Sequence, residues 1–455
     1  MLTETSPLLR NLGVNQALQS DEQYATKRPE NEVLIEAEID TGEIEDAFSW
    51  RKLWKYTGPG FLMSIAYLDP GNLEADLQSG ASAGYSLLWL LLVAHIAGQL
   101  IQCLSARLGV VTGEHLAQLI KQHYSRPVSI TFWIITEIAI IGSDIQEIVG
   151  TAIALRIIFG IPLWVGTLLT AIDTFTFMLL QNYGVRKLEA VFMVLIGTMA
   201  TCFWIEMYMC SPDVGEIIKG SLIPIIPRNA YVQAVAMIGA FIMPHNLYLH
   251  SALVMTRKTD PSSYSKIKES NFYFAIESGI ALFFSYLINM AIVVVFARVF
   301  YSPNEDKPLP GLYDAADVLT NTLGSASRYL WALGLLAAGN SSTITGTLAG
   351  QFIIEGFFGK IFSKSWHRLI ITRSIALVPS MLVAIYSVND FDNMGEFLNV
   401  LQSLCLPTAL IPLMKLTNSK SVMSKSFRTR YICGGIYFIF ITYIAILPLK
   451  EAATL

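Results

Sequence analysis

Long apolar runs dominate the chain from about residue 51 to its end. The runs without any Asp, Glu, Lys or Arg are residues 85–106, 229–256, 278–297, 329–354, 397–414 and 431–449. A helix needs about 20 apolar residues to cross the hydrocarbon core of a bilayer. With some less uniform segments, the pattern predicts an all-α polytopic membrane protein with eleven transmembrane helices. Their approximate centres are Leu68, Ile96, Ile141, Leu169, Gly197, Met243, Ala291, Thr343, Val378, Leu404 and Phe440.

Residues 1–50 break this pattern. They are acidic and nearly free of aromatic side chains, so we expect a disordered tail rather than a cleavable signal peptide. Twice in this tail an acid is followed, after three residues, by two bulky aliphatic residues. This spacing resembles the acidic dileucine signal that vesicle-coat adaptors bind, with chance occurrence as the alternative. The residues concerned are Glu4, Leu8 and Leu9, and Glu30, Leu34 and Ile35.

Composition supports the membrane assignment and excludes several classes of protein. Hydrophobic residues make up 53% and charged residues 15% of the chain, against about 25% charged in soluble domains. A soluble enzyme of this size cannot bury so much apolar surface. The net charge of −4 provides no basic field for nucleic acid. The five cysteines are scattered without zinc-binding spacing, so neither a zinc site nor a disulfide framework is expected.

The distribution of Lys and Arg predicts the orientation. These residues are concentrated in alternate connections that include the entry to the first span, which favours a cytoplasmic N-terminus. An odd number of spans then places the C-terminus on the opposite side. We expect a first five-helix repeat over residues 51–210, a second over 225–416, and a cytoplasmic loop with helix 11 over 417–455.

Two of the predicted spans contain a proline at their centre. Asp-Pro-Gly-Asn stands at 69–72 in the first span, and Met-Pro-His-Asn at 243–246 in the sixth. Proline removes a helix hydrogen bond, and unwound backbone at that depth is tolerated where it lines a cavity or binds a ligand. The motifs lie five spans apart, so the two helices run in opposite directions. This arrangement is typical of an inverted repeat with its substrate site at the paired breaks, whereas two packing kinks are the alternative.

The residues at the breaks favour a divalent transition metal as ligand. Asp69 offers a hard carboxylate, and Asn72 offers a neutral carbonyl. Met243 adds a thioether, which selects against magnesium and calcium. Unwound backbone near Ala66 and Ala240 would add carbonyl oxygens. With one carboxylate, the predicted site holds a metal and releases it again.

Both motifs resemble the hallmark motifs of the Nramp family (natural resistance-associated macrophage proteins). Further similar stretches are residues 106–113, 182–189 and 341–347, and the resemblance covers about residues 48–450. The tail and residues 48–54 look most like eukaryotic, particularly plant-type, members.

The Nramp resemblance implies a proton-coupled importer of manganese and iron(II) with the leucine-transporter fold. The metal ions are cargo, and no cofactor is expected. By motif, Asp69, Asn72, Met243 and the carbonyls of Ala66 and Ala240 match the metal ligands. Asn399 aligns with a position that joins the metal shell in the inward-closed state, with Gln402 as a nearby alternative. One departure is visible, because Asn340 stands where the family usually has Gln.

A row of acids in the third predicted span provides a proton route. Glu137, Asp144 and Glu147 are spaced by seven and three residues, which puts them on one helical stripe. Arg373, in the ninth span, is their natural partner, because an unpaired intramembrane cation is costly. The resemblance implies the same route, from Asp69 past these acids and Arg373.

Two histidines follow the sixth-span break. His245 is the stronger candidate for a pH-sensitive group beside the metal, and His250 the weaker one, with ordinary packing histidines as the alternative for both.

Three other functions fit a membrane protein with these motifs less well. A sodium-coupled carrier of organic solutes would not need Met243. A carrier of magnesium or aluminium would be expected to replace that methionine. A metal sensor that binds without transport would signal through the short tail. The dileucine-like patterns favour an endosomal, lysosomal or vacuolar membrane, with the plasma membrane second.

Overall fold

The structure is a computed structural model of the whole chain. It describes residues 39–40, 48–170, 185–259, 263–302, 308–359, 378, 381–382, 391–423 and 427–428. Both dileucine-like patterns and Arg373 lie outside the described residues, as does the whole of the apolar run 431–449.

The described part of the chain is almost entirely helical. Its helices, in chain order, are α2 (Trp50–Tyr56), α3 (Pro59–Ile65), α4 (Pro70–Ala83), α5 (Leu88–Thr112), α6 (Leu116–His123), α7 (Arg126–Phe159), α9 (Val185–Cys210), α10 (Val214–Leu222), the 3-10 turn Arg228–Ala230, α11 (Tyr231–Phe241), α12 (Pro244–Leu253), the 3-10 turn Val254–Thr256, α13 (Tyr264–Val299), α14 (Leu312–Leu323), α15 (Ser325–Phe358), α17 (Phe391–Cys405) and α18 (Pro407–Asn418). Two short strands, β1 (Ile39–Asp40) and β2 (Arg257–Lys258), pair in parallel.

Within the described residues, six helical stretches are long and apolar enough to cross a membrane. They are Leu88–Thr112, Arg126–Phe159, Met193–Cys210, Arg228–Thr256, Tyr264–Val299 and Met394–Asn418. For each of the three spans predicted around Leu169, Val378 and Phe440, most of the residues lie outside the described part. The total of eleven spans therefore stays a prediction.

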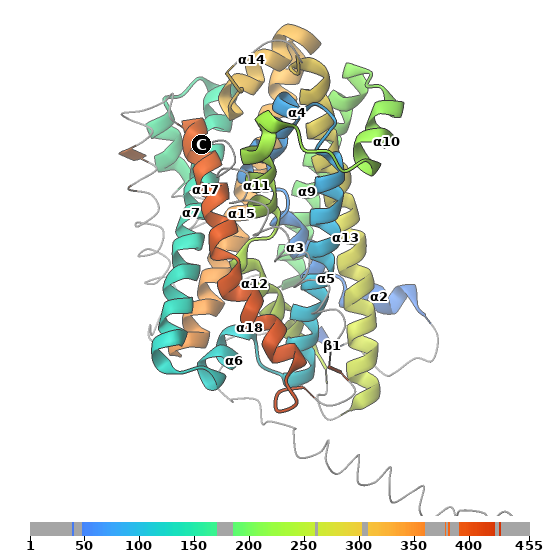
Figure 1. Cartoon of the computed structure of the whole chain (residues 1–455), viewed down its shortest axis with the longest axis vertical. Helices are drawn as coiled ribbons and strands as arrows, with labels where there is room; N and C mark the ends of the chain where they lie inside the picture. The colour runs from blue at the N-terminus through green and yellow to red at the C-terminus, as the bar shows by residue number, and fades with distance from the viewer. Residues whose placement is uncertain are drawn as a thin grey trace, which may run out of the picture.

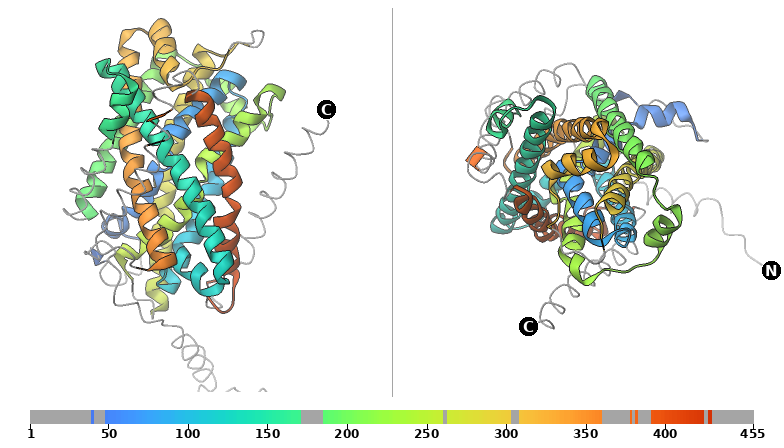
Figure 2. Two further views of the ribbon diagram at one scale, coloured as in Figure 1. Left: turned by 90° about the vertical axis from the view of Figure 1, so that its left-hand side faces the viewer. Right: turned by 90° about the horizontal axis from the view of Figure 1, so that it is seen from above.

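The long helices lie side by side along the long axis of the molecule (Figure 1). We call the end that carries α10 and α14 the upper end, and the end that carries α6 and β1 the lower end. Helix α7 packs against α15, and α13 packs against α4 and α5. Seen from above, α4 lies within the ring of long helices (Figure 2). The first proline motif is therefore at the centre of the bundle.

Proline and glycine set several of the helix bounds. Pro59, Pro70 and Pro244 are the first residues of α3, α4 and α12, where the missing N–H removes no helix bond. Gly113 and Gly160 follow α5 and α7 with positive φ values of 70° and 69°, a conformation that glycine adopts without steric cost. The sequence thus fixes these ends locally.

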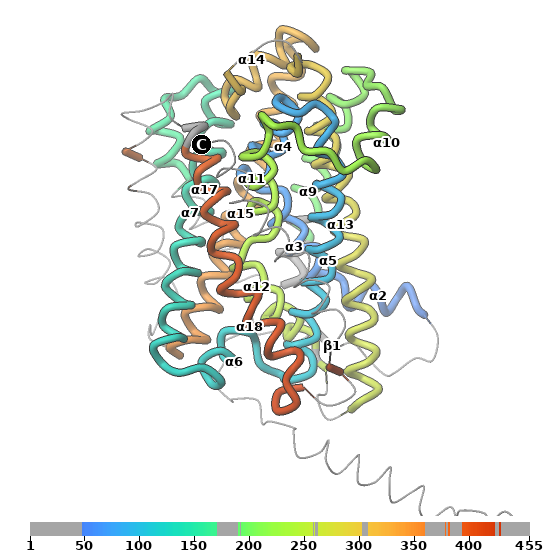
Figure 3. Tube along the Cα trace, in the orientation of Figure 1, coloured from blue at the N-terminus to red at the C-terminus, as the bar shows by residue number. Residues whose placement is uncertain are grey.

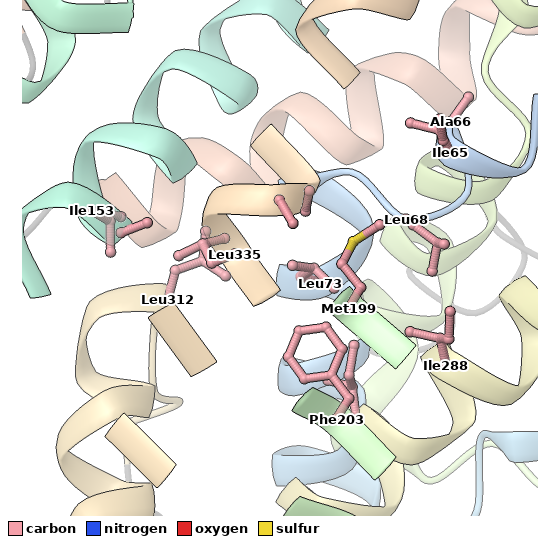
Figure 4. Packing of buried hydrophobic residues seen from close by; sticks show 14 of the residues in the cluster. Ile65, Ala66, Leu68, Leu73, Ile153, Met199, Phe203, Ile288, Leu312 and Leu335 are labelled. Atoms are coloured by element: carbon pink, nitrogen blue, oxygen red, sulfur yellow. The ribbon is translucent and has the colours of Figure 1, made fainter. Parts of the chain in front are cut away.

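A large hydrophobic cluster surrounds the first proline motif. Met199 and Phe203 of α9 lie near Leu73 of α4 and Ile288 of α13 (Figure 4). Leu68, between α3 and α4, is fully buried in the same cluster. The non-helical segment is therefore held by apolar packing on one side, which leaves its polar groups to face the other side.

Candidate metal centre

The two proline motifs lie between pairs of short helices that contact each other. Helix α3 contacts α12, and α4 contacts α11. Figure 3 shows the two pairs side by side, although they come from different parts of the chain. The first helix of each pair, α3 or α11, contacts the second helix of the other pair, α12 or α4. The two pairs therefore run antiparallel. The non-helical residues 66–69 and 242–243 therefore lie at a similar level of the bundle.

Asp69 and Asn72 form one buried polar group. Asp69 caps α4, and its Oδ1 accepts from the backbone N–H of Asn72 at 2.8 Å. The Asn72 side-chain amide donates to the same oxygen at 3.0 Å and to the Ala66 carbonyl at 3.2 Å. Asn72 Oδ1 is buried without a hydrogen-bond partner among the described residues. The amide therefore keeps one buried acceptor available for a ligand.

The Ala66 and Ala240 carbonyls share one sequence feature. Each stands four residues before a proline, Pro70 or Pro244. In a continuous helix the N–H of residue i+4 would bond to that carbonyl, and proline has none. Both alanines are buried, at 3% and 0% exposure. The prolines thus remove the helix donors of two carbonyl oxygens near the paired breaks, and the Ala66 carbonyl accepts from the Asn72 amide instead.

Met243 completes the predicted ligand set from the second motif. It is the residue before α12, with extended backbone, and it is 1% exposed. Over the described part of the chain, no cluster of three or more His, Cys, Asp or Glu side chains gathers as a metal centre. A site at the breaks therefore combines one carboxylate with amide, backbone and thioether groups, which is a set that suits a softer divalent ion.

Asn399 links three helices above these residues. Its Oδ1 accepts from Gln146 Nε2 of α7 at 2.9 Å, and its Nδ2 donates to the Gly71 carbonyl of α4 at 3.0 Å. Its amide is therefore engaged in helix contacts in this conformation. Gln402, the alternative, donates to the Ala139 carbonyl of α7 at 3.0 Å.

A cavity of about one water molecule's size lies directly above Pro70. Glu74 and Gln146 line it, together with Met394 and Gly395 of α17. A side chain at Gly395 would overlap the Glu74 carboxylate. The amide link through Asn399 and this tight packing close the breaks from the upper end.

The acids of α7 face a glycine of α15. Asp144 and Glu147 are 4% and 2% exposed. A Cβ placed on Gly346 would lie 3.2 Å from Glu147 Oε1 and 3.3 Å from Asp144 Oδ1, so both carboxylates converge there. Ser143 also donates to Glu147, at 3.4 Å. Glu137 is half-buried two turns lower on the same helix.

The predicted histidines lie on the short helix that follows Met243. His245 and His250 are 3% and 0% exposed. His245 Nδ1 and both ring nitrogens of His250 have no hydrogen-bond partner among the described residues. Asn340 lies in α15, and its Oδ1 likewise lacks a partner in the part of the chain that the structure describes.

Comparison with known proteins decides the family. Residues 60–450 match the model of the natural resistance-associated macrophage protein-like (Nramp) family. The chain belongs to the Nramp family.

Two eukaryotic Nramp relatives are about equally similar to the chain. It is 49% identical over 386 residues to the metal transporter nramp1 homolog of Dictyostelium discoideum, covering 84% of this chain and 72% of the relative. It is also 49% identical over 427 residues to metal transporter Nramp2 of Populus trichocarpa, covering 90% and 79%. The expected resemblance to eukaryotic members is confirmed.

A solved transporter structure has the same fold. The Eremococcus coleocola manganese transporter matches with a TM-score of 0.80 and 32% identity, covering 90% of this chain and 89% of that one. The chain is therefore an integral membrane protein for metal transport and not an enzyme. The metal is its cargo and not a cofactor.

Sequence reasoning missed Gln146 as part of this Nramp site. It stands between Asp144 and Glu147 and joins α7 to Asn399. A polar residue between two intramembrane acids was the available signal. An amide costs less than an acid in a membrane, so its presence there is a weaker signal of function.

Proposed function

We propose that this protein carries divalent transition metal ions, chiefly manganese and iron(II), together with protons into the cytosol by alternating access. The observation that carries the proposal is the buried group of Asp69, Asn72 and Ala66, in which Asn72 Oδ1 has no hydrogen-bond partner among the described residues. A cation supplies the missing partner for this oxygen. The similar fold and 32% identity of the Eremococcus coleocola manganese transporter support this cargo.

Asp69, Asn72, Met243 and the carbonyls of Ala66 and Ala240 hold the metal in this proposal. The thioether of Met243 discriminates against magnesium and calcium, because hard cations prefer oxygen ligands. Asn399 and Gln402 reach the metal in a conformation other than the one described above. In the present conformation both amides bond to neighbouring helices.

The chain is organised as two inverted five-helix repeats, residues 51–210 and 225–416, followed by helix 11. The antiparallel contacts of α3 with α12 and α4 with α11 support this proposal. In it, each pair of short helices is one interrupted span, and the two interruptions share one substrate site.

Protons leave Asp69 through the acids of α7. Asp144 and Glu147 converge at Gly346, and Glu137 follows toward the lower end. Arg373 pairs with these acids in the proposed route. His245 and His250 also belong to the proposed proton pathway, with His245 as the pH-sensitive group beside the metal.

The lower end faces the cytosol, and the N-terminal tail lies on that side. Glu4, Leu8 and Leu9 form one adaptor-binding signal, and Glu30, Leu34 and Ile35 form the other. They direct the protein to an endosomal, lysosomal or vacuolar membrane, with the plasma membrane as its route or second location.

Manganese uptake into proteoliposomes tests this function. The purified protein is exposed to manganese at acidic and at near-neutral outside pH, while an internal dye reports acidification. Acid-stimulated uptake with internal acidification is expected. Asp69→Asn should abolish both, because it removes the only carboxylate of the site. Asp317→Asn, on an exposed acid of α14, is the matched control and should change neither.

Two results would contradict the symport proposal. Manganese binding measured by calorimetry without uptake would favour the metal sensor. Uptake without acidification at either pH would indicate a uniporter or channel.

A further inference from the structure

Helix α3 is a short helix between two non-helical joints. Before it stands Gly58, with a φ of 145° that favours glycine, and after it comes the non-helical segment 66–69. The helix has only seven residues, Pro59–Ile65, and it ends next to the Ala66 carbonyl. A movement of α3 would therefore shift one wall of the metal site without unfolding its neighbours.

A single buried carboxylate holds the N-terminus of α3. Glu277 of α13 is fully buried. Its Oε1 accepts from the backbone N–H groups of Gly58, Gly60 and Phe61 at 2.8, 2.9 and 3.0 Å, and its Oε2 accepts from Gly60 at 2.8 Å. These N–H groups have no acceptor within their own helix, and the helix dipole adds to the attraction of a carboxylate.

The segment before α3 is fixed as well, through Arg257. Its guanidinium is buried and donates to the Lys55 carbonyl at 3.0 Å and to the Thr57 carbonyl at 2.6 Å. The α2–α3 junction is thus anchored by Arg257, and α3 itself by Glu277. Arg257 holds the residues before Gly58, whereas Glu277 holds Gly58 and the first turn of α3, so without the Glu277 contact α3 can turn while α2 stays anchored.

Close packing accompanies the Glu277 contact. A Cβ on Gly60 would lie 2.6 Å from Ser278 Cα and would overlap the Glu277 carboxylate. Only glycine lets α3 approach α13 this closely. The contact is therefore specific to one position of α3, and any tilt away from α13 breaks all four hydrogen bonds together.

We propose that Glu277 is the latch of the lower gate: its carboxylate holds α3 in the closed position, and release of α3 opens the metal site toward the lower end. Glu277 is a positioning residue that acts through α3. The inference rests on the proposed transport function, because a gate has a purpose only where cargo leaves.

Cysteine accessibility tests the latch independently of transport. The native cysteines, Cys103, Cys202, Cys210, Cys405 and Cys433, are replaced by serine, and Met63→Cys on α3 serves as reporter of the lower side. Val149→Cys, in the upper cavity, reports the upper side. Both parent positions are buried, so slow reaction with a water-soluble thiol reagent is expected in detergent.

Glu277→Gln should raise the reactivity of Cys at position 63 by about tenfold, the factor that corresponds to about 1.4 kcal/mol. Reactivity at position 149 should stay unchanged, since loss of the latch opens one side only. The matched control is Glu269→Gln, which removes a buried acid of the same helix that pairs with Lys52 of α2. It should leave both positions slow.

Gly60→Ala is the second route to the same state. Its Cβ pushes α3 from α13, so it should also raise reactivity at position 63 alone. Equal reactivity in parent, Glu277→Gln and Gly60→Ala proteins that still elute as folded species would overturn the latch. A parallel rise at positions 63 and 149 would overturn it too, since that indicates general loosening. Failure of the parent to take up manganese would instead count against the transport function.

Discussion

At the scale of single residues, the proposed metal site depends on an acceptor that the described residues leave unsatisfied. The Asn72 amide group donates to Asp69 and to the Ala66 carbonyl, whereas its oxygen has no partner among the described residues. A buried acceptor of this kind is costly unless something binds it. In the proposal, the side chain that sets the choice of metal is Met243.

Met243→Ala should weaken manganese binding by about tenfold or more and lessen the discrimination against calcium. The reason is that a soft ligand is lost while the oxygen ligands remain. Calorimetry with manganese and calcium measures both effects. Met237→Ala, which truncates another fully buried methionine two turns earlier in α11, is the control. Equal losses in the two variants would show that Met243 acts by packing alone.

Gly346→Ala should slow acid-driven manganese uptake while manganese affinity stays the same. The new Cβ approaches the carboxylates of Asp144 and Glu147 to 3.3 and 3.2 Å, and overpacking of this kind costs about 1–3 kcal/mol. Uptake and internal acidification are measured together. Gly350→Ala, one turn further along α15, meets nothing within 4 Å and should be neutral. Normal acidification in the Gly346 variant would exclude this point from the proton route.

At the scale of elements, interruption of the helices matters more than their length. Helix α11 ends at Phe241, and α12 begins at Pro244. Because Pro244 has no N–H, the two helices cannot continue as one regular helix at this point. The same arrangement separates α3 from α4 at Pro70. The proposed metal ligands stand at or next to the ends of these four helices rather than along their faces.

Pro244→Ala should lower manganese affinity without lowering thermal stability. The alanine provides an N–H that can reach the Ala240 carbonyl, so a continuous helix competes with metal for this oxygen. Pro244 is the first residue of α12, where it makes no helix hydrogen bond, so its replacement removes none and does not destabilise the bundle. Thermal unfolding and calorimetry give the two quantities. Pro412→Ala, within α18 and away from the breaks, should leave metal affinity unchanged. If both variants bind manganese normally, the freed carbonyl is not a ligand.

At the scale of the whole molecule, the upper and lower ends are expected to face different compartments. The long helices run between them, and α10 and α14 lie at one end while α6 lies at the other (Figure 1). We predict the orientation from the distribution of Lys and Arg, because connections rich in these residues stay on the cytoplasmic side during membrane insertion.

An impermeant thiol reagent tests the orientation. In intact cells it should label Ile218→Cys on the exposed face of α10, whereas Lys121→Cys on α6 should react only after permeabilisation. Both positions are exposed to solvent or headgroups, so burial does not explain a difference. The reverse pattern would invert the direction of transport.

The sorting signals belong to the same scale. Joint replacement Leu8→Ala and Leu9→Ala, together with Leu34→Ala and Ile35→Ala, should move a fluorescent fusion from internal membranes to the plasma membrane. Uptake by the purified protein should not change, because these residues lie outside residues 60–450, the part that matches the family. If the location of the fusion protein did not change, the two dileucine-like patterns would be chance occurrences and not sorting signals.

Local chemistry in the sequence was sufficient for much of this protein. Apolar runs predict the spans, prolines predict where helices stop, and the two motifs identify the family and the candidate ligands. These features depend on neighbours within about four residues, which is the reach of a helix hydrogen bond.

Only the tertiary structure decided how distant segments complete each other. Gln146 meets Asn399, and Glu277 meets the amides of Gly58 and Gly60, across more than 200 positions of sequence in each case. Asp144 and Glu147 share one stripe by spacing, yet the glycine that receives them belongs to α15. No periodicity within one helix determines which helix lies opposite, because many apolar faces are interchangeable in a bundle. Packing of all the helices together determines which of these residues meet, including Glu277 and the amides before and within α3.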